Sequence, residues 1–291
     1  MLLCCMKTIQ DVFTLFKQSL GNVYDANEIE AVTLLVVNEI SGLSKAQIKA
    51  FPEKEIIVEQ AEKLDEILSR LKTGEPVQYI LGYTEFYGLP FKVNPSVLIP
   101  RSETEELVEW VLNSVEGKYS KASILDIGTG SGCIAISLKK NLTGALVSAI
   151  DISVDALETA KQNADLNGVD VSFIQADILN PSTYNSQTSI SIIISNPPYV
   201  TLYDKMQMHT NVTDFEPHSA LFVPDEDPLI FYKAIADFAL DHLTENGLLF
   251  LEINESLGME TVELLKKKGF KNIELREDMS GRDRMIKGTR I

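Results

Sequence analysis

The sequence predicts an α/β protein, built as a doubly wound parallel sheet with a small N-terminal helical domain and a β-hairpin linker. From residue 121 onward, short apolar runs alternate with segments of helical periodicity, which is the pattern of repeated βαβ units. In roughly the first 75 residues, apolar positions instead recur every three or four residues, as in amphipathic helices. The length of 291 residues accommodates one large unit and one smaller one.

Three helices are expected in the N-terminal region. The clearest lies in the stretch EKEIIVEQAEKLDEILSRLKTG, between Pro52 near its start and Gly74 just past its end. One face of this helix is apolar: Ile57, Ala61, Leu64, Leu68 and Leu71. Two earlier helices are expected over 8–20 and 27–40, although AVTLLVV in the second also fits a strand.

A change of pattern after the third helix predicts the linker. The stretch GYTEFYGLPFKVNP carries aromatic and β-branched residues around Gly88 and Pro90, which indicates a β-hairpin. Ser102 and Glu105 have the spacing of a capping box and predict the start of the next helix. The expected helical domain, linker and sheet domain are 1–76, 77–101 and 102–291.

Seven strands are expected after the linker. Five of them belong to the alternating part of the chain: 123–127, 145–150, 171–175, 190–194 and 248–253. The final stretch KNIELREDMSGRDRMIKGTR predicts two more, joined by a turn at Ser280 and Gly281.

Composition and charge exclude several classes of function. The formal charge is −16, from 42 acidic and 26 basic residues, so the molecule repels phosphate backbones and nucleic acid is a disfavoured partner. Cys4, Cys5 and Cys133 form neither a disulfide framework nor a spaced metal cluster, which fits a cytoplasmic protein without a metal centre. No segment is apolar for long enough to cross a bilayer, so no membrane partner is expected.

A glycine-rich loop predicts a nucleotide-like ligand. In ILDIGTGSGCIAI a strand is followed by alternating glycines and then a helix, which brings backbone close to a ligand at a helix N-terminus. The dinucleotide fingerprint would need its third glycine at Cys133, so that interpretation is weakened. The alternative is a tight strand-to-helix turn that binds nothing, and it would require the three alternating glycines to occur by chance. The candidate residues of this loop are Gly128, Thr129, Gly130, Ser131 and Gly132.

Acidic residues follow three successive predicted strands. Asp126 precedes the glycines, and Asp151, which lies 23 residues after Gly128, could accept both hydroxyls of a ribose or cap the helix near Ser153. Asp177 could accept a hydrogen bond from the exocyclic amine of adenine, and its neighbour Ile178 is also predicted to be a cofactor-binding residue. Because ligands of parallel sheets bind at the carboxyl ends of the strands, these acids predict an adenosine cleft.

The stretch ISNPPYV ends the fourth predicted strand. Asn196 supplies an amide oxygen, whereas Pro197 and Pro198 supply carbonyls without N–H donors, so the site accepts hydrogen bonds and donates almost none. A flat NH₂ group would be matched by it, with the ring of Tyr199 against its face. The alternative is a turn that merely stops the strand, which the two prolines alone would support.

These motifs together resemble a known enzyme class. GTGSG with Asp151, Asp177 and NPPY resembles the S-adenosylmethionine-dependent methyltransferases that modify planar nitrogens. The stretch EPVQYILGYTEFYGLPFKVNPSVLIPRSETEELVEW resembles the linker of bacterial peptide chain release factor glutamine N5-methyltransferases, and DFEPHSAL, LLFLEI and GRDRMIKG continue the likeness. The resemblance implies a seven-stranded, Rossmann-like methyltransferase domain and a helical domain that docks class I release factors. It implies a methylated glutamine in a Gly-Gly-Gln stretch.

A mechanism follows from these residues. The side-chain oxygen of Asn196 and the carbonyl of Pro197 would accept the two N–H bonds of the glutamine amide and stabilise the growing positive charge. Tyr199 would set the plane of the amide, and no strong base is required. Asn196 is therefore counted as a catalytic, substrate-binding and cofactor-binding residue, and Pro198 as substrate-binding. The protein is expected to be a monomer.

Departures from the family pattern and rival functions remain. The family usually has proline at Ser102, an acidic-Gly pair where Asp227 precedes Pro228, and a Gly-rich, Gln-containing stretch where EINESLG contains Asn254. Because of these departures, the resemblance does not predict the detailed shape of the substrate channel's rim. The rival enzymes methylate amino groups of adenine or cytosine in nucleic acid, or a glutamine of a ribosomal protein. A non-catalytic adaptor is the rival from another class.

Overall fold

The computed structural model describes residues 6–115, 122–184, 189–206 and 210–291, so Cys4 and Cys5 lie outside the described residues. The chain forms two compact units: Met1–Gly82 with Thr210–Phe215, and Tyr83–His209 with Glu216–Ile291. In these ranges no helix is both long and apolar enough to cross a membrane. The expected division at residues 77 and 102 stays a prediction.

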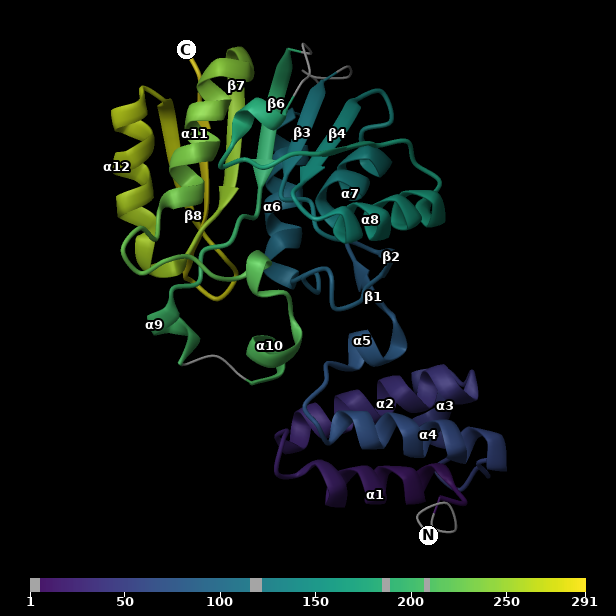
Figure 1. Ribbon diagram of the computed structural model, residues 1–291. Coiled ribbons are helices and arrows are strands. Elements are labelled where there is room, and N and C mark those ends of the chain that lie inside the picture. The colour runs from purple at the N-terminus through teal and green to yellow at the C-terminus, as the bar shows by residue number, and fades with distance from the viewer. Residues whose placement is uncertain (1–5, 116–121, 185–188, 207–209) are drawn as a thin grey trace. The chain divides into compact units, whose positions relative to one another are not determined.

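The first unit is a bundle of helices (Figure 1). Its elements are α1 Ile9–Leu20, α2 Ala26–Ser41, α3 Lys45–Ala50, α4 Val58–Leu71, α5 Val77–Leu81 and α10 Thr210–Phe215. Thr8, Asp25 and Ser44 cap the first three helices in capping boxes, which satisfy backbone N–H groups that lack helical partners. The AVTLLVV stretch is helical, and Val36 and Val37 are buried in the core of this unit.

The second unit contains the sheet. Its helices are α6 Ser102–Val115, α7 Cys133–Asn141, α8 Val154–Asn167, α9 Leu202–Lys205, α11 Ile230–His242 and α12 Gly258–Lys268. Its strands are β1 Tyr83–Phe86, β2 Leu89–Lys92, β3 Ser123–Ile127, β4 Leu146–Asp151, β5 Ser172–Gln175, β6 Ile190–Ser195, β7 Leu243–Glu252, β8 Lys271–Glu277 and β9 Asp283–Thr289. Among its described residues are also the short 3₁₀ helices η2 Pro181–Thr183, η3 His218–Ala220 and η4 Glu255–Leu257.

The seven-stranded sheet has the order β5-β4-β3-β6-β7-β9-β8. The first five strands in this order are parallel, and β9 runs antiparallel to both β7 and β8. The chain winds outward from β3 to β5 and then returns to place β6 on the other side of β3. The strand order therefore reverses between β3 and β6, which is where parallel sheets bind ligands. This arrangement confirms the predicted fold class.

Alternating residues of the strands face two separate cores. Ile124, Ile192 and Phe250 pack with residues of α6, α7 and α8, whereas their neighbours Leu125 and Ile193 pack with residues of α11 and α12. Figure 1 shows these two groups of helices on opposite sides of the sheet. Because the central strands β3 and β6 are covered on both faces, each reads as a nearly continuous apolar run in the sequence.

Of two local predictions around the linker, one is confirmed and one needs correction. The predicted hairpin is confirmed, since β1 and β2 pair antiparallel. The predicted capping box is wrong in its partners, because Ser102 is the first helical residue and its hydroxyl donates to Glu103. Glu105 instead accepts the backbone N–H of Tyr87 at 2.7 Å, which fastens the hairpin to α6.

Candidate functional site

The loop between β3 and α7 holds three glycines in the left-handed backbone region. The angle φ is 72° at Gly128, 54° at Gly130 and 82° at Gly132. At Gly132 a methyl group would lie 2.9 Å from Ile136 Cδ1 and 3.1 Å from Ala160 Cβ. At Gly128 and Gly130 the same position is open, so backbone there can approach a ligand at the start of α7.

Asp126 supports this loop from within the core. The hydroxyl of Thr129 donates to Asp126 Oδ2 at 2.6 Å, and Asp126 has no exposed surface. Burial raises the pKa of this carboxyl to about 7. The side chain of Thr129 thus fixes the loop's conformation through a buried acid.

Asp151 joins the loop to the end of β4. Its Oδ2 accepts the N–H of Gly130 at 2.8 Å, and its Oδ1 accepts the N–H of Ser153 at 2.9 Å. Burial raises the pKa of the Asp151 carboxyl, while these backbone donors lower it. The helix cap is Ser153, whose hydroxyl accepts the N–H of Ala156 at 3.1 Å, so the capping alternative for Asp151 is wrong. Each carboxylate oxygen keeps a second lone pair for a ligand.

Asp177 and Ile178 lie just beyond β5, at the same edge of the sheet, and both are half-buried. The Oδ1 atom of Asp177 accepts the N–H of Leu179 at 2.9 Å, and its backbone N–H donates to Thr183 Oγ1 at 2.9 Å. These bonds hold the turn in which Asp177 and Ile178 line the cavity described next.

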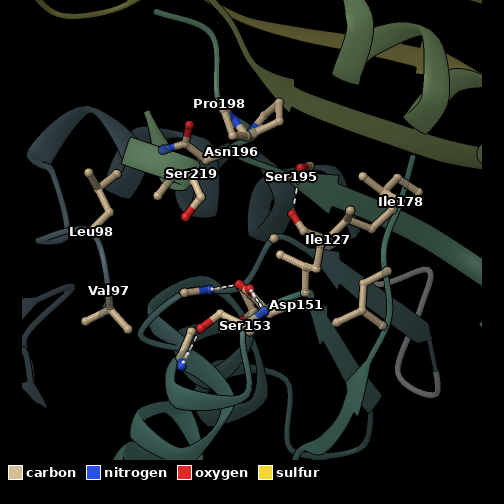
Figure 2. Close-up of a pocket in the computed structure, with 18 of the residues that line it drawn as sticks. Val97, Leu98, Ile127, Asp151, Ser153, Ile178, Ser195, Asn196, Pro198 and Ser219 are labelled. Atoms are coloured by element: carbon tan, nitrogen blue, oxygen red, sulfur yellow. Dashed lines mark hydrogen bonds between the residues drawn. The ribbon is translucent and has the colours of Figure 1, made fainter. Parts of the chain in front are cut away.

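A cavity of about 350 Å³ collects most of the predicted cofactor-binding residues. Its walls include Gly128, Thr129, Gly130, Ser131, Asp151, Asp177, Ile178, Asn196, Pro197 and Pro198. Figure 2 shows Asp151 and Ser153 on one side of it, with Asn196 and Pro198 on the opposite side. Gly132 is not part of this wall, and its role is the close packing of α7 against Ala160. The volume lies in the range of small-molecule sites.

Asn196 follows β6 at the point where the strand order reverses. Its neighbour Ser195 donates to the carbonyl of Ile127 at 2.6 Å and so ties the ends of β6 and β3 together (Figure 2). The Nδ2 atom of Asn196 donates to Thr104 Oγ1 at 3.1 Å, and Thr104 donates to Glu252 Oε2 at 2.7 Å. These bonds use the donor end of the amide and leave Oδ1 as the end that can accept from a ligand.

Tyr199 faces a second cavity of about 470 Å³ rather than the first. Its hydroxyl donates to Glu252 Oε1 at 3.1 Å, and burial raises its pKa. This cavity is lined mainly by polar residues, with Asp204, Asn254, Glu255, Arg282 and Arg284 among them. Both cavities share five residues: Leu98, Arg101, Asn196, Pro197 and Ala220. The Asn-Pro pair therefore borders two chambers at once.

Comparisons with known proteins agree with this architecture. A family described as "PrmC N-terminal domain" matches residues 12–82, and one described as "Methyltransferase small domain" matches residues 104–214. A release factor glutamine methyltransferase of Flavobacterium psychrophilum is 48% identical, and the alignment covers 96% of this chain and 98% of the relative. The chain belongs to the release factor glutamine methyltransferase family.

Other relatives extend the comparison. The member of this family from Bacteroides thetaiotaomicron is 41% identical, over 94% of this chain and 97% of its own. The solved T. thermophilus 16S rRNA N2 G1207 methyltransferase, in complex with AdoMet and guanosine, has a TM-score of 0.53 at 16% identity. That alignment covers 72% of this chain and 50% of the other, and the likeness concerns the fold. Methyltransferases of this family use S-adenosylmethionine.

The sequence reasoning missed two buried polar residues of the site. Thr104 and Glu252 are 2% and 1% exposed, and they lie at the start of α6 and the end of β7. A threonine and a glutamate among otherwise apolar, buried positions are the signal that could have found them, since buried polar groups require partners. Arg101 was also missed, and it pairs with buried Glu216 at 2.5 Å.

Two departures from the family pattern have structural partners. Asn254 caps η4, and its Nδ2 donates to the carbonyl of Tyr199 at 3.0 Å and to Asp204 at 3.1 Å. This side chain thus braces the backbone beside the Asn-Pro pair. Asp227, before Pro228, pairs with Lys233 at 2.6 Å.

Proposed function

We propose that this chain transfers a methyl group from S-adenosylmethionine to the side-chain nitrogen, N5, of the glutamine in the Gly-Gly-Gln stretch of class I release factors. Family membership over nearly the whole chain supports the reaction. The observation that carries the chemistry is the shared wall of the two cavities, where Asn196 and Pro197 border both. A group that needs acceptors would meet them at this wall.

The first cavity fits the cofactor. The open positions at Gly128 and Gly130 admit a ligand against the backbone, and the carboxylate of Asp151 suits two ribose hydroxyls. Asp177 suits the exocyclic amine of an adenine, with Ile178 against the ring. When bound, S-adenosylmethionine supplies a methyl group activated by the positive charge of its sulfonium.

The shared wall suits an amide nitrogen. The lone pair of that nitrogen is delocalised into its carbonyl, so the nitrogen is a weak nucleophile. Hydrogen bonds from its N–H groups to Asn196 Oδ1 and the carbonyl of Pro197 stabilise the charge that grows on it during transfer. Holding the amide in line is worth roughly 7 to 11 kcal/mol of barrier. One N–H proton then leaves to water, so no base is needed.

The second cavity suits the peptide on either side of the glutamine. Its wall carries cationic Arg282 and Arg284 beside acidic Asp204 and Glu255, which can pair with the carbonyls and N–H groups of an extended chain. The ring of Tyr199 borders it and would lie against the flat amide. A cytoplasmic location, a monomeric state and the absence of direct nucleic-acid binding complete the proposal.

One experiment tests the function. The protein is incubated with labelled S-adenosylmethionine and purified release factor, and the labelled residue is mapped by mass spectrometry. The expected label lies on the glutamine of the Gly-Gly-Gln stretch and disappears when that glutamine is replaced by glutamate in the release factor. Label in RNA, DNA or a ribosomal protein, with none in the release factor, would reject the proposal.

A further inference from the structure

A buried hydrogen-bond chain runs from Asn196 through Thr104 to Glu252. Asn196 Nδ2 donates to Thr104 Oγ1 at 3.1 Å, and Thr104 Oγ1 donates to Glu252 Oε2 at 2.7 Å. Building on the proposed function, we infer that Thr104 and Glu252 are positioning residues that keep the oxygen of the Asn196 amide turned toward the substrate nitrogen. Neither residue needs to touch the substrate to act in this way.

The direction of the chain follows from the chemistry of its members. The two ends of an asparagine amide have nearly the same size and shape, so packing alone cannot choose between them. The Thr104 hydroxyl has a single proton, and it gives that proton to a carboxylate that only accepts when ionised. Its lone pairs are then what it offers to Asn196. The amide must therefore donate from Nδ2, which leaves Oδ1 to accept a hydrogen bond from the substrate.

Glu252 holds both ends of the Asn-Pro-Pro-Tyr stretch. Its Oε2 accepts from Thr104, and its Oε1 accepts from the hydroxyl of Tyr199 at 3.1 Å. The backbone places it well, because Glu252 follows Leu251 on β7, and Leu251 pairs in register with Ser195 on β6. A single carboxylate with 1% exposure thus fixes the amide on one side and the phenol on the other.

Reversal of the amide would oppose the reaction. An inverted Asn196 would aim N–H donors at the N–H donors of the substrate, so the acceptor would be lost without any change in shape. Replacing Thr104 by valine keeps the volume but removes the group that selects Nδ2. Leaving a buried donor unpaired then disfavours the productive orientation, by roughly tenfold to 100-fold in population.

The test compares Thr104→Val, Thr104→Ser and Asn196→Ala with the wild type and with the double variant Thr104→Val, Asn196→Ala. We expect Thr104→Val to lower kcat by about tenfold to 100-fold, while the dissociation constant for S-adenosylmethionine and the melting temperature stay near wild type. Thr104→Ser retains a hydroxyl and should restore most of kcat. In the Asn196→Ala background, Thr104→Val should have almost no further effect, because its action passes through that amide.

Three results separate the possible failures. Wild-type kcat in Thr104→Val, or a full additional loss in the double variant, would overturn the positioning role. Absence of release factor methylation by the wild type would instead overturn the proposed function. If the valine variant does not fold, Thr104→Ala carries the same expectation, since alanine favours the helix.

Discussion

Asn196 carries the proposed chemistry with a side chain that is neither charged nor acidic. Its surroundings determine its role: its Nδ2 atom donates to Thr104, and the residue lies in the wall that the two cavities share. Reactivity at this residue therefore depends on orientation rather than on a shifted pKa.

Replacing Asn196 by alanine removes one preorganised acceptor. Turnover should fall by about 100-fold or more, by analogy with the loss of one oxyanion-hole donor. Cofactor affinity, measured by calorimetry, should be largely kept. Asn27→Ala on the exposed start of α2 is the matched control and should leave turnover unchanged. Unaltered turnover in Asn196→Ala would remove this residue from the mechanism.

Asp151→Ala should weaken binding of S-adenosylmethionine. The substitution removes the proposed ribose acceptor and also frees the N–H groups of Gly130 and Ser153, so the glycine loop loses an anchor. Isothermal calorimetry measures the effect directly. A dissociation constant equal to that of the wild type would refute the ribose assignment.

Glu252 should give the reaction an acid limb. Burial raises the pKa of its carboxyl, while Thr104, Tyr199 and the positive charge of Arg284 lower it and the charge of Glu103 raises it. As pH falls through this raised pKa, the carboxyl of Glu252 gains a proton that it can donate to Thr104. The hydrogen bonds from Asn196 through Thr104 to Glu252 then lose their fixed direction. The value of kcat at saturating cofactor should therefore fall on the acid side.

The matched control for this limb is Asn196→Ala. With no amide left to orient, its residual turnover should lack the limb assigned to Glu252. An identical pH profile of kcat in the two proteins would show that the limb belongs to another group.

At the scale of elements, the central strands were predictable because both of their faces are buried. The predicted strands 123–127 and 190–194 correspond to β3 and β6 within one residue. By contrast, β7 begins at Leu243, whereas the predicted strand began at 248. The first part of the strand was not predicted because Asn246 and Gly247 resemble a turn in the sequence, and Asn246 indeed has a φ of 62°. The helices α3 and α5 were not predicted, since five or six residues carry too little periodicity.

The site divides along the same lines. The predicted residues of the glycine loop and of the Asn-Pro stretch are local in sequence, so their spacing reveals them. The contact between Thr104 and Glu252 joins residues 148 positions apart, and no local pattern encodes it. Tyr199 was placed against the substrate by its position in the stretch, and its bond to Glu252 became visible only in the fold.

The turn from β3 to α7 should be sensitive to a single methyl group. Gly132→Ala forces φ of 82° on an L-residue and sets Cβ 2.9 Å from Ile136. We expect a loss of about 2 to 4 kcal/mol in the free energy of unfolding, measured by urea denaturation. Gly281→Ala, at φ of 75° with open space around it, isolates the conformational part and should cost less. Equal losses would mean that the contact with Ile136 is relieved.

At the scale of the molecule, the net charge of −16 disfavours nucleic acid as a substrate and leaves protein as the favoured class. We expect no binding of labelled RNA or single-stranded DNA at physiological salt, measured by fluorescence anisotropy. Competitor RNA should leave release factor methylation unchanged. Salt-sensitive binding, with methyl incorporation into the oligonucleotide, would revive the rival activity on adenine or cytosine.

The two cavities meet at one wall but are lined by different residues elsewhere. The proposed methyl donor and methyl acceptor thus reach the shared wall from different cavities, and neither has to cross the other's binding site. With the proposed cofactor in the first cavity and the proposed peptide in the second, we expect the two substrates to bind in either order, and the demethylated cofactor to leave while the release factor is still bound.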